Sequence, residues 1–240
     1  MELSDFLLYV IPIFTLEVLA AATGSYYLWK NPSPFKNTKY LVLFLWFTVF
    51  VEAFGAYSPA AYFSDYELFS FLKDTRFAQN YWWYNIYTPL NFSFYILYFN
   101  SFLKNKYWES IFQFLVATFL FISILIYIFT DVFFTGSSSF VSIGGTLLLF
   151  FSIALFYFEL LRSDLLLQLM RFLPFYISVG VLIFSLCVTP IEMFSQYFNT
   201  KAGNELFVTL RSNVLLYANI FMYATFTLGF LICSKKKKSF

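Results

Sequence analysis

Long apolar runs separated by short polar stretches dominate the chain. Each run is at least as long as the roughly 20 residues that an α-helix needs to cross the hydrocarbon core of a membrane. Apolar positions are continuous within each run instead of alternating, which argues against transmembrane β-strands. The pattern therefore predicts an all-α, polytopic membrane protein, a seven-transmembrane-helix bundle with helices at residues 6–29, 40–63, 81–103, 107–130, 139–161, 172–194 and 207–233.

Seven such helices use nearly all of the 240 residues. We therefore expect a single seven-helix transmembrane domain over residues 1–234, followed by a basic cytoplasmic tail at 235–240. The longest connection on the predicted outer side, residues 64–80, places Tyr66, Phe69 and Leu72 among charged neighbours. That mixture predicts either a short helix lying on the membrane surface or a solvated loop.

Basic residues gather in alternate connections, and this asymmetry predicts the orientation. The connections between the first and second, third and fourth, and fifth and sixth predicted helices, and the tail, are rich in Lys and Arg. The intervening connections are acidic or balanced, as in Asp65, Glu67 and Asp74 against Lys73 and Arg76. Basic loops stay in the cytoplasm, so we expect the N-terminus outside and the C-terminus cytoplasmic.

The amino-acid composition limits the kinds of binding and catalysis that the chain can support. The chain is 60% hydrophobic and only 12% charged, against about 25% charged in soluble domains. Its one basic run, at 235–238, follows a predicted membrane helix, which favours contact with lipid over nucleic acid. The absence of histidine removes imidazole catalysis, haem ligation through histidine and histidine-based zinc sites. We expect no cofactor, no metal and no catalytic residue.

Four polar residues, which are energetically unfavourable inside a membrane, are predicted to lie at the same depth in it. Glu17, Glu52, Asn91 and Asn219 fall near the middle of the first, second, third and seventh predicted helices. A charged side chain at that depth costs about 3 kcal/mol on insertion scales, so these residues are expected to face the bundle interior. We expect both acids to be at least partly protonated, because desolvation and a like-charged neighbour disfavour the ionised form.

Helical spacing extends this interior face. Thr88, Asn91 and Tyr95 lie on one side of the third predicted helix, and Thr48 with Glu52, Asn219 with Tyr223, and Ser185, Thr189 and Glu192 repeat the pattern elsewhere. The candidates for binding a ligand or a proton are Glu17, Glu52, Asn91, Asn219, Thr88, Tyr95 and Tyr223. The alternative is that these groups only join helices to one another. Glu192 and Arg211 are a candidate ion pair near the outer surface, and Pro59, Pro89 and Pro190 are expected to bend their helices and free backbone carbonyls.

The topology resembles that of microbial rhodopsins and G-protein-coupled receptors. Unlike rhodopsins, the chain has no lysine in the last predicted helix to form a Schiff base with retinal, and unlike the receptors it has no Asp-Arg-Tyr after the third predicted helix. The segments WYNIYTPLNFSFY (83–95) and RSNVLLYANIFMY (211–223) resemble small bacterial seven-helix proteins that are similar to the membrane modules of sensor kinases. That resemblance implies a multi-pass protein of the bacterial inner membrane. It transfers no functional residue.

Three functions follow as hypotheses. The first is a sensor-like or regulatory module that holds a small ligand in a midplane polar pocket and acts through a cytoplasmic or membrane signalling partner. The second is a small transporter or channel coupled to protons or cations through Glu17 and Glu52. An intramembrane lipid enzyme is the least favoured, because the chain offers neither histidine nor metal ligands.

The orientation is testable with reporters. A fluorescent protein that matures only in the cytoplasm, fused after residue 240, is expected to be bright, because the basic connections retain that side. Alkaline phosphatase, active only outside, is expected to be active when inserted in the 64–80 connection and inactive at the C-terminus. The reverse pattern would refute the predicted orientation.

Overall fold

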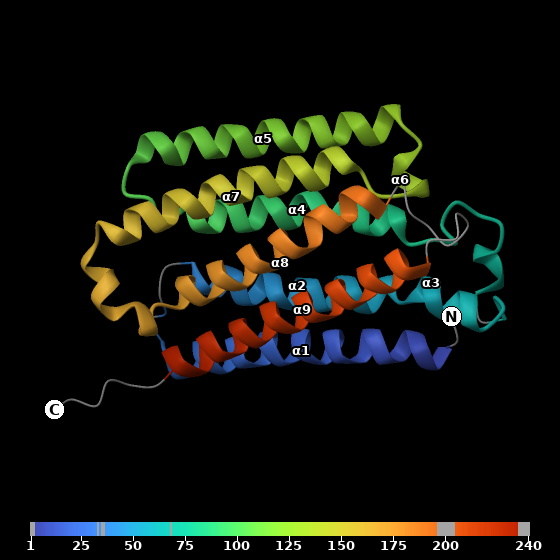
Figure 1. Ribbon diagram of the computed structural model, residues 1–240, viewed down its shortest axis with the longest axis horizontal. Helices are drawn as coiled ribbons and strands as arrows, with labels where there is room; N and C mark the ends of the chain where they lie inside the picture. The colour runs from blue at the N-terminus through green and yellow to red at the C-terminus, as the bar shows by residue number, and fades with distance from the viewer. Residues whose placement is uncertain (1–2, 33, 35–36, 68, 196–204, 235–240) are drawn as a thin grey trace.

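The computed structural model describes residues 3–32, 34, 37–67, 69–195 and 205–234. The regular secondary structure of these residues is entirely helical, in an elongated bundle (Figure 1). The helix α1 (Leu3–Lys30) begins at one end of the bundle, and α9 (Glu205–Cys233) ends at the opposite end. The basic tail predicted at 235–240 lies outside the described residues.

Helices of membrane-spanning length account for most of the structure. By length and composition, six segments among the described residues qualify as spans: Phe6–Lys30, Thr38–Phe63, Lys106–Phe129, Ser139–Leu161, Leu173–Phe194 and Leu206–Cys233. An all-helical, multi-pass membrane protein is thereby confirmed. The third predicted segment forms a helix, α4 (Tyr81–Asn100), but its Tyr, Trp and Asn residues lower its mean hydropathy and it is not one of the six.

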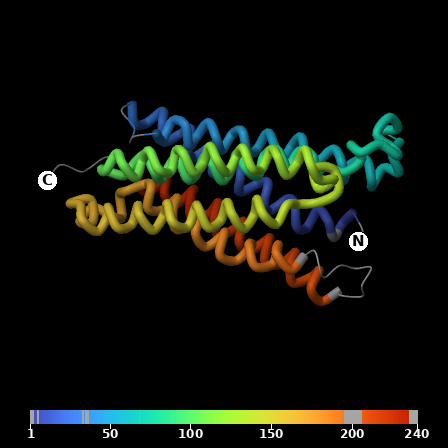
Figure 2. The backbone as a smooth tube through the Cα atoms, turned by 90° about the horizontal axis from the view of Figure 1, so that it is seen from above, coloured from blue at the N-terminus to red at the C-terminus, as the bar shows by residue number. Residues whose placement is uncertain are grey.

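The helices pack in a fixed order across the bundle. At one edge, α1 packs against α2 (Thr38–Gly55) and α9, and α9 packs in turn against α8 (Leu173–Ser195). At the other edge, α5 (Lys106–Phe129) packs against α4 and α7 (Ser139–Leu161), which also contact each other. Figure 2 shows α8 and α9 diverging from the other helices toward the end at which α8 finishes.

The second predicted helix is interrupted. It consists of α2 and the short α3 (Tyr57–Phe63), with Ala56 between them. Pro59 has no N–H to donate to the carbonyl of Gly55, four residues earlier. The side-chain amide of Asn80 donates to that carbonyl instead, at 2.9 Å. A polar side chain thus satisfies the backbone group that the proline leaves free.

The two connections 64–80 and 130–138 contain little helix. Residues 64–80 form a loop whose described part includes one 3₁₀ turn, Ser70–Leu72, and Asp65, Tyr66 and Asp74 adopt positive φ there. Of the two alternatives for this connection, the structure therefore has the loop. Between α5 and α7 lies the single turn α6 (Val132–Thr135). Asn85 of α4 donates to the carbonyls of Val132, Phe133 and Gly136 at 3.2, 3.0 and 2.8 Å and so holds this turn against α4.

Aromatic side chains fill the core. Phe99, Phe156, Phe226 and Phe230 are fully buried, and the rings of Phe44 and Phe94 stack at 3.9 Å between centroids. The outer faces expose Leu, Ile and Phe side chains, among them Leu8, Phe114 and Ile128. Such faces suit contact with lipid.

The close approach of α4 and α7 depends on one glycine. A Cβ at Gly145 would lie 2.6 Å from Cγ of Phe92, whereas a Cβ at the adjacent Gly144 would meet Phe119 at an ordinary 3.8 Å. We expect Gly145→Ala to be less stable than Gly144→Ala by about 1–3 kcal/mol, the usual cost of overpacking. The gain in helix propensity is the same for both and cancels in the comparison. Unfolding in mixed detergent–SDS micelles measures the difference; equal stability of the two variants would contradict this packing.

Candidate functional site

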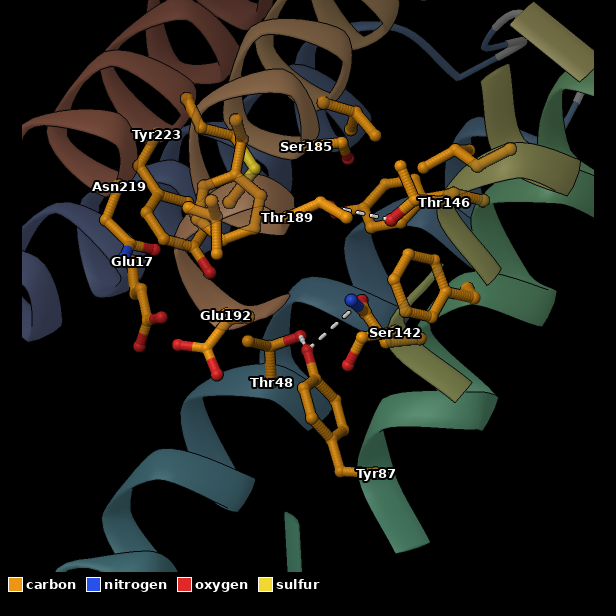
Figure 3. Close-up of a pocket in the computed structure, with 18 of the residues that line it drawn as sticks. Glu17, Thr48, Tyr87, Ser142, Thr146, Ser185, Thr189, Glu192, Asn219 and Tyr223 are labelled. Carbon is orange, nitrogen blue, oxygen red and sulfur yellow. Dashed lines mark hydrogen bonds between the residues drawn. The ribbon is translucent and has the colours of Figure 1, made fainter. Parts of the chain in front are cut away.

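A cavity of about 230 Å³ lies inside the bundle, bounded by α1, α2, α4, α7, α8 and α9. It extends from the middle of the helices toward the end at which α8 and α9 diverge. Figure 3 shows polar side chains from these helices directed around one common space. The structure therefore brings six separate helices to a single polar site.

Six of the seven sequence-predicted candidates line this cavity: Glu17, Glu52, Asn91, Tyr95, Asn219 and Tyr223. The seventh, Thr88, does not. Its hydroxyl donates to the carbonyl of Tyr84 at 2.8 Å, within its own helix. Helical spacing grouped Thr88 with Asn91 and Tyr95, but of these three residues only Asn91 and Tyr95 line the cavity.

Seven further polar residues line the cavity: Thr48, Tyr87, Ser142, Thr146, Ser185, Thr189 and Glu192. Ser185 and Thr189 belong to a stripe visible in the sequence, and Thr48 precedes Glu52 by one turn. Ser142 and Thr146 are also one turn apart, and that spacing is the signal that could have identified α7 as part of the site.

The two midplane acids have different partners. Tyr84 donates a hydrogen bond of 2.7 Å to Oε2 of Glu52, so α4 holds this carboxyl group against α2. Glu17 is only 3% exposed, and its Oε2 has no hydrogen-bond partner among the described residues. Tyr223 hydrogen-bonds the Glu17 carboxyl group, which therefore has one partner and one oxygen still without a donor.

Hydroxyl groups link the helices around the cavity. Thr48 and Tyr87 join α2 to α4 at 2.8 Å, and the Tyr87 hydroxyl also donates to Oδ1 of Asn91 at 3.3 Å (Figure 3). On the opposite wall, Thr146 and Thr189 join α7 to α8 at 2.8 Å. These neutral groups can exchange partners with a bound molecule at small cost.

An ion pair lies where α8 and α9 together diverge from the other helices. Arg211 of α9 donates through Nε and a terminal nitrogen to Oε1 of Glu192, at 3.1 and 2.8 Å. Glu192 also lines the cavity, as expected from its place on the polar face that it shares with Ser185 and Thr189. The cavity thus ends at an acid that already has a cationic partner.

No protein-family model matches the chain, and no curated protein or solved structure matches it. The site must therefore be interpreted from its own geometry. Within the described ranges, no group of three or more Cys, Asp or Glu side chains is placed to hold a metal ion.

The bond from Tyr84 to Glu52 gives a stability prediction. Tyr84→Phe keeps the ring beside Gly55 but removes the donor, and we expect a loss of about 0.5–2 kcal/mol of unfolding free energy, as for other buried and interhelical hydrogen bonds. Tyr81→Phe is the matched control, because the Tyr81 side chain is partly exposed at the start of the same helix. SDS unfolding measures both variants. An equal loss from Tyr84→Phe in a Glu52→Ala background would show that the two side chains are not coupled.

Proposed function

We propose that this chain is a seven-helix, sensor-like module of a bacterial inner membrane that acts through a signalling partner. In this proposal α4 forms the third of seven spans, α1 begins outside and α9 ends at the cytoplasm. The basic residues of the described connections support this orientation, because Lys30, Lys104, Lys106, Arg162 and Arg171 all belong to connections at the end where α1 finishes.

The observation that carries the sensor proposal is the shared cavity. A molecule bound there would touch side chains from six helices at once. Such a molecule favours whichever helix arrangement gives it the best contacts and so shifts the population toward that arrangement. Binding of a molecule in the cavity would then change the positions of the helices, which is what a sensor requires.

The α8–α9 pair is suited to carry that change. A Cβ at Gly180 would lie 2.8 Å from Phe226, and a Cβ at Gly229 would lie 2.7 Å from Tyr176, so the two helices touch closely through these glycines. Closely packed helices tend to move as a unit. The same pair diverges from the bundle beside the cavity, where Pro190 interrupts the hydrogen-bonding of α8.

A candidate output surface lies at the other end of α8. The 3₁₀ segment η2 (Asp164–Arg171) joins α7 to α8 and exposes 87% of Leu167 and 73% of Met170. It contacts both α7 and α9. Movement of the α8–α9 pair would therefore displace η2, and in the proposed orientation η2 faces the cytoplasmic side.

Proton- or cation-coupled transport is the second candidate. Glu17 and Glu52 line one cavity, and no Lys or Arg is among the described residues that line it. Two acids without a basic neighbour can accept a proton or a cation in turn. This candidate requires the cavity to open alternately to both sides of the membrane.

The sensor proposal predicts coupling between the cavity and η2. With a photo-crosslinking amino acid at position 167, we expect a defined crosslinked partner in native membranes, and we expect Glu17→Gln to change its yield at least about threefold, since it alters the cavity and leaves η2 intact. A crosslinker at Phe114, on the exposed face of α5, is the control position and should capture lipid alone.

Two results would oppose the sensor proposal. An identical crosslinking yield in the wild type and in Glu17→Gln would show that the cavity is not coupled to η2. A proton or cation flux in proteoliposomes that Glu17→Gln and Glu52→Gln both abolish would favour transport instead. The sensor proposal expects no such flux.

A further inference from the structure

The cavity holds a buried carboxyl group that is only partly hydrogen-bonded: Tyr223 bonds the Glu17 side chain, but one of its oxygens has no partner among the described residues. Glu17 sits at the middle of α1, its side chain is 3% exposed, and its Oε2 has no hydrogen-bond partner among the described residues. The carboxyl group lines the cavity beside Asn219 and Tyr223 (Figure 3). A buried acceptor without a donor is costly, and a ligand that supplies the donor removes that cost.

Charge is distributed unevenly along the cavity. Glu192 closes one end, but Arg211 already pairs with it at 2.8 Å. Glu17 and Glu52 line the same cavity as Glu192, and the described lining residues include no Lys or Arg. A positive group bound near Glu17 or Glu52 would be paired with the ionised form of that acid, whereas Arg211 disfavours a positive group near Glu192.

Aromatic rings surround the same space. Tyr87, Tyr95, Tyr223 and Phe92 line the cavity together with Glu17 and Glu52. The face of an aromatic ring attracts an ammonium group, and the attraction strengthens when water is excluded. Carboxyl groups combined with aromatic rings are a lining that recognises organic cations.

The size of the cavity and the number of its acids argue against a bare metal ion. A volume of about 230 Å³ equals several times the roughly 30 Å³ that one water occupies in the liquid. Calcium needs six to eight oxygen ligands, often from several carboxylates, and the described residues present no cluster of three acids for a metal. A small organic molecule fills the space better than an ion.

We propose that this cavity binds a small organic cation bearing an ammonium group, with Glu17 as its counterion, Glu52 as a second acceptor and the surrounding rings as its walls. This inference rests on the proposed function, for which it names the class of ligand. Ammonium donors satisfy Oε2 of Glu17, and any hydroxyl on the ligand reaches the Thr and Ser groups of the opposite wall.

Three probes of similar size and different charge test the ligand class. Ethanolammonium, ethylene glycol and glycolate are titrated separately into the full-length protein in nanodiscs, and binding is followed by tryptophan fluorescence and by thermal stability. We expect ethanolammonium to bind at least about tenfold more tightly than ethylene glycol, and glycolate not to bind, because a desolvated charge pair contributes strongly to affinity. This comparison uses the wild type alone, so it does not depend on the folding of any variant.

Variants then locate the binding. Glu17→Gln is expected to weaken ethanolammonium binding at least about thirtyfold, since it removes the counterion. Glu109→Gln, in the first turn of α5 and away from the cavity, is the matched control and should bind as the wild type does. Equal binding of ethanolammonium by the wild type and by Glu17→Gln overturns the proposal.

The outcomes separate this inference from the sensor proposal. Preferential binding of ethylene glycol or glycolate, or no binding of any of the three probes, overturns the organic-cation class and leaves the crosslinking test of the sensor proposal unaffected. Binding of ethanolammonium through Glu17 without any change in the crosslink at position 167 supports the ligand class and overturns the sensor function.

Discussion

A polar group buried away from water must find its partner inside the protein, and this constraint governs the whole bundle. The backbone meets it by being helical. Where the backbone is interrupted, side chains supply the missing bonds, as Asn80 does for the carbonyl of Gly55. Asn85 does the same for three carbonyls around α6. The amides that look out of place in an apolar sequence are therefore the groups that permit its bends and turns.

The three acids of the cavity meet the same constraint to different degrees. Glu192 has a cationic partner in Arg211, and Glu52 has a hydroxyl donor in Tyr84. Glu17 keeps one oxygen without any donor among the described residues. Tyr223 hydrogen-bonds the same carboxyl group. A ligand that brings a further donor to this depth would satisfy Glu17 more fully.

Much of this arrangement could be predicted from the sequence, because hydropathy and helical spacing are local properties. The apolar runs predicted the helices, and the spacing of polar residues placed Asn91, Tyr95 and Tyr223 on the cavity side. The break at Ala56 agrees with the bend expected from Pro59. The bonds from Asn80 and Asn85 join segments distant in sequence, so no local pattern contains them. Thr88 shares a helical face with Asn91 and Tyr95 but does not line the cavity, and its hydroxyl donates to the carbonyl of Tyr84 within α4.

Packing explains why the cavity exists at this place. At Gly180, Gly229 and Gly145 the absence of a side chain lets a neighbouring aromatic ring approach the backbone, and these contacts fix the separation of α8 from α9 and of α4 from α7. Where α7 of one pair faces α8 of the other, the cavity wall includes the short side chains of Ser142, Thr146, Ser185 and Thr189, which leave space that longer side chains would fill. Close contact within each pair thus leaves room between them, and the polar cavity occupies that room. A ligand there would bind across the boundary between two units that are each well packed, which is where binding can move one unit relative to the other.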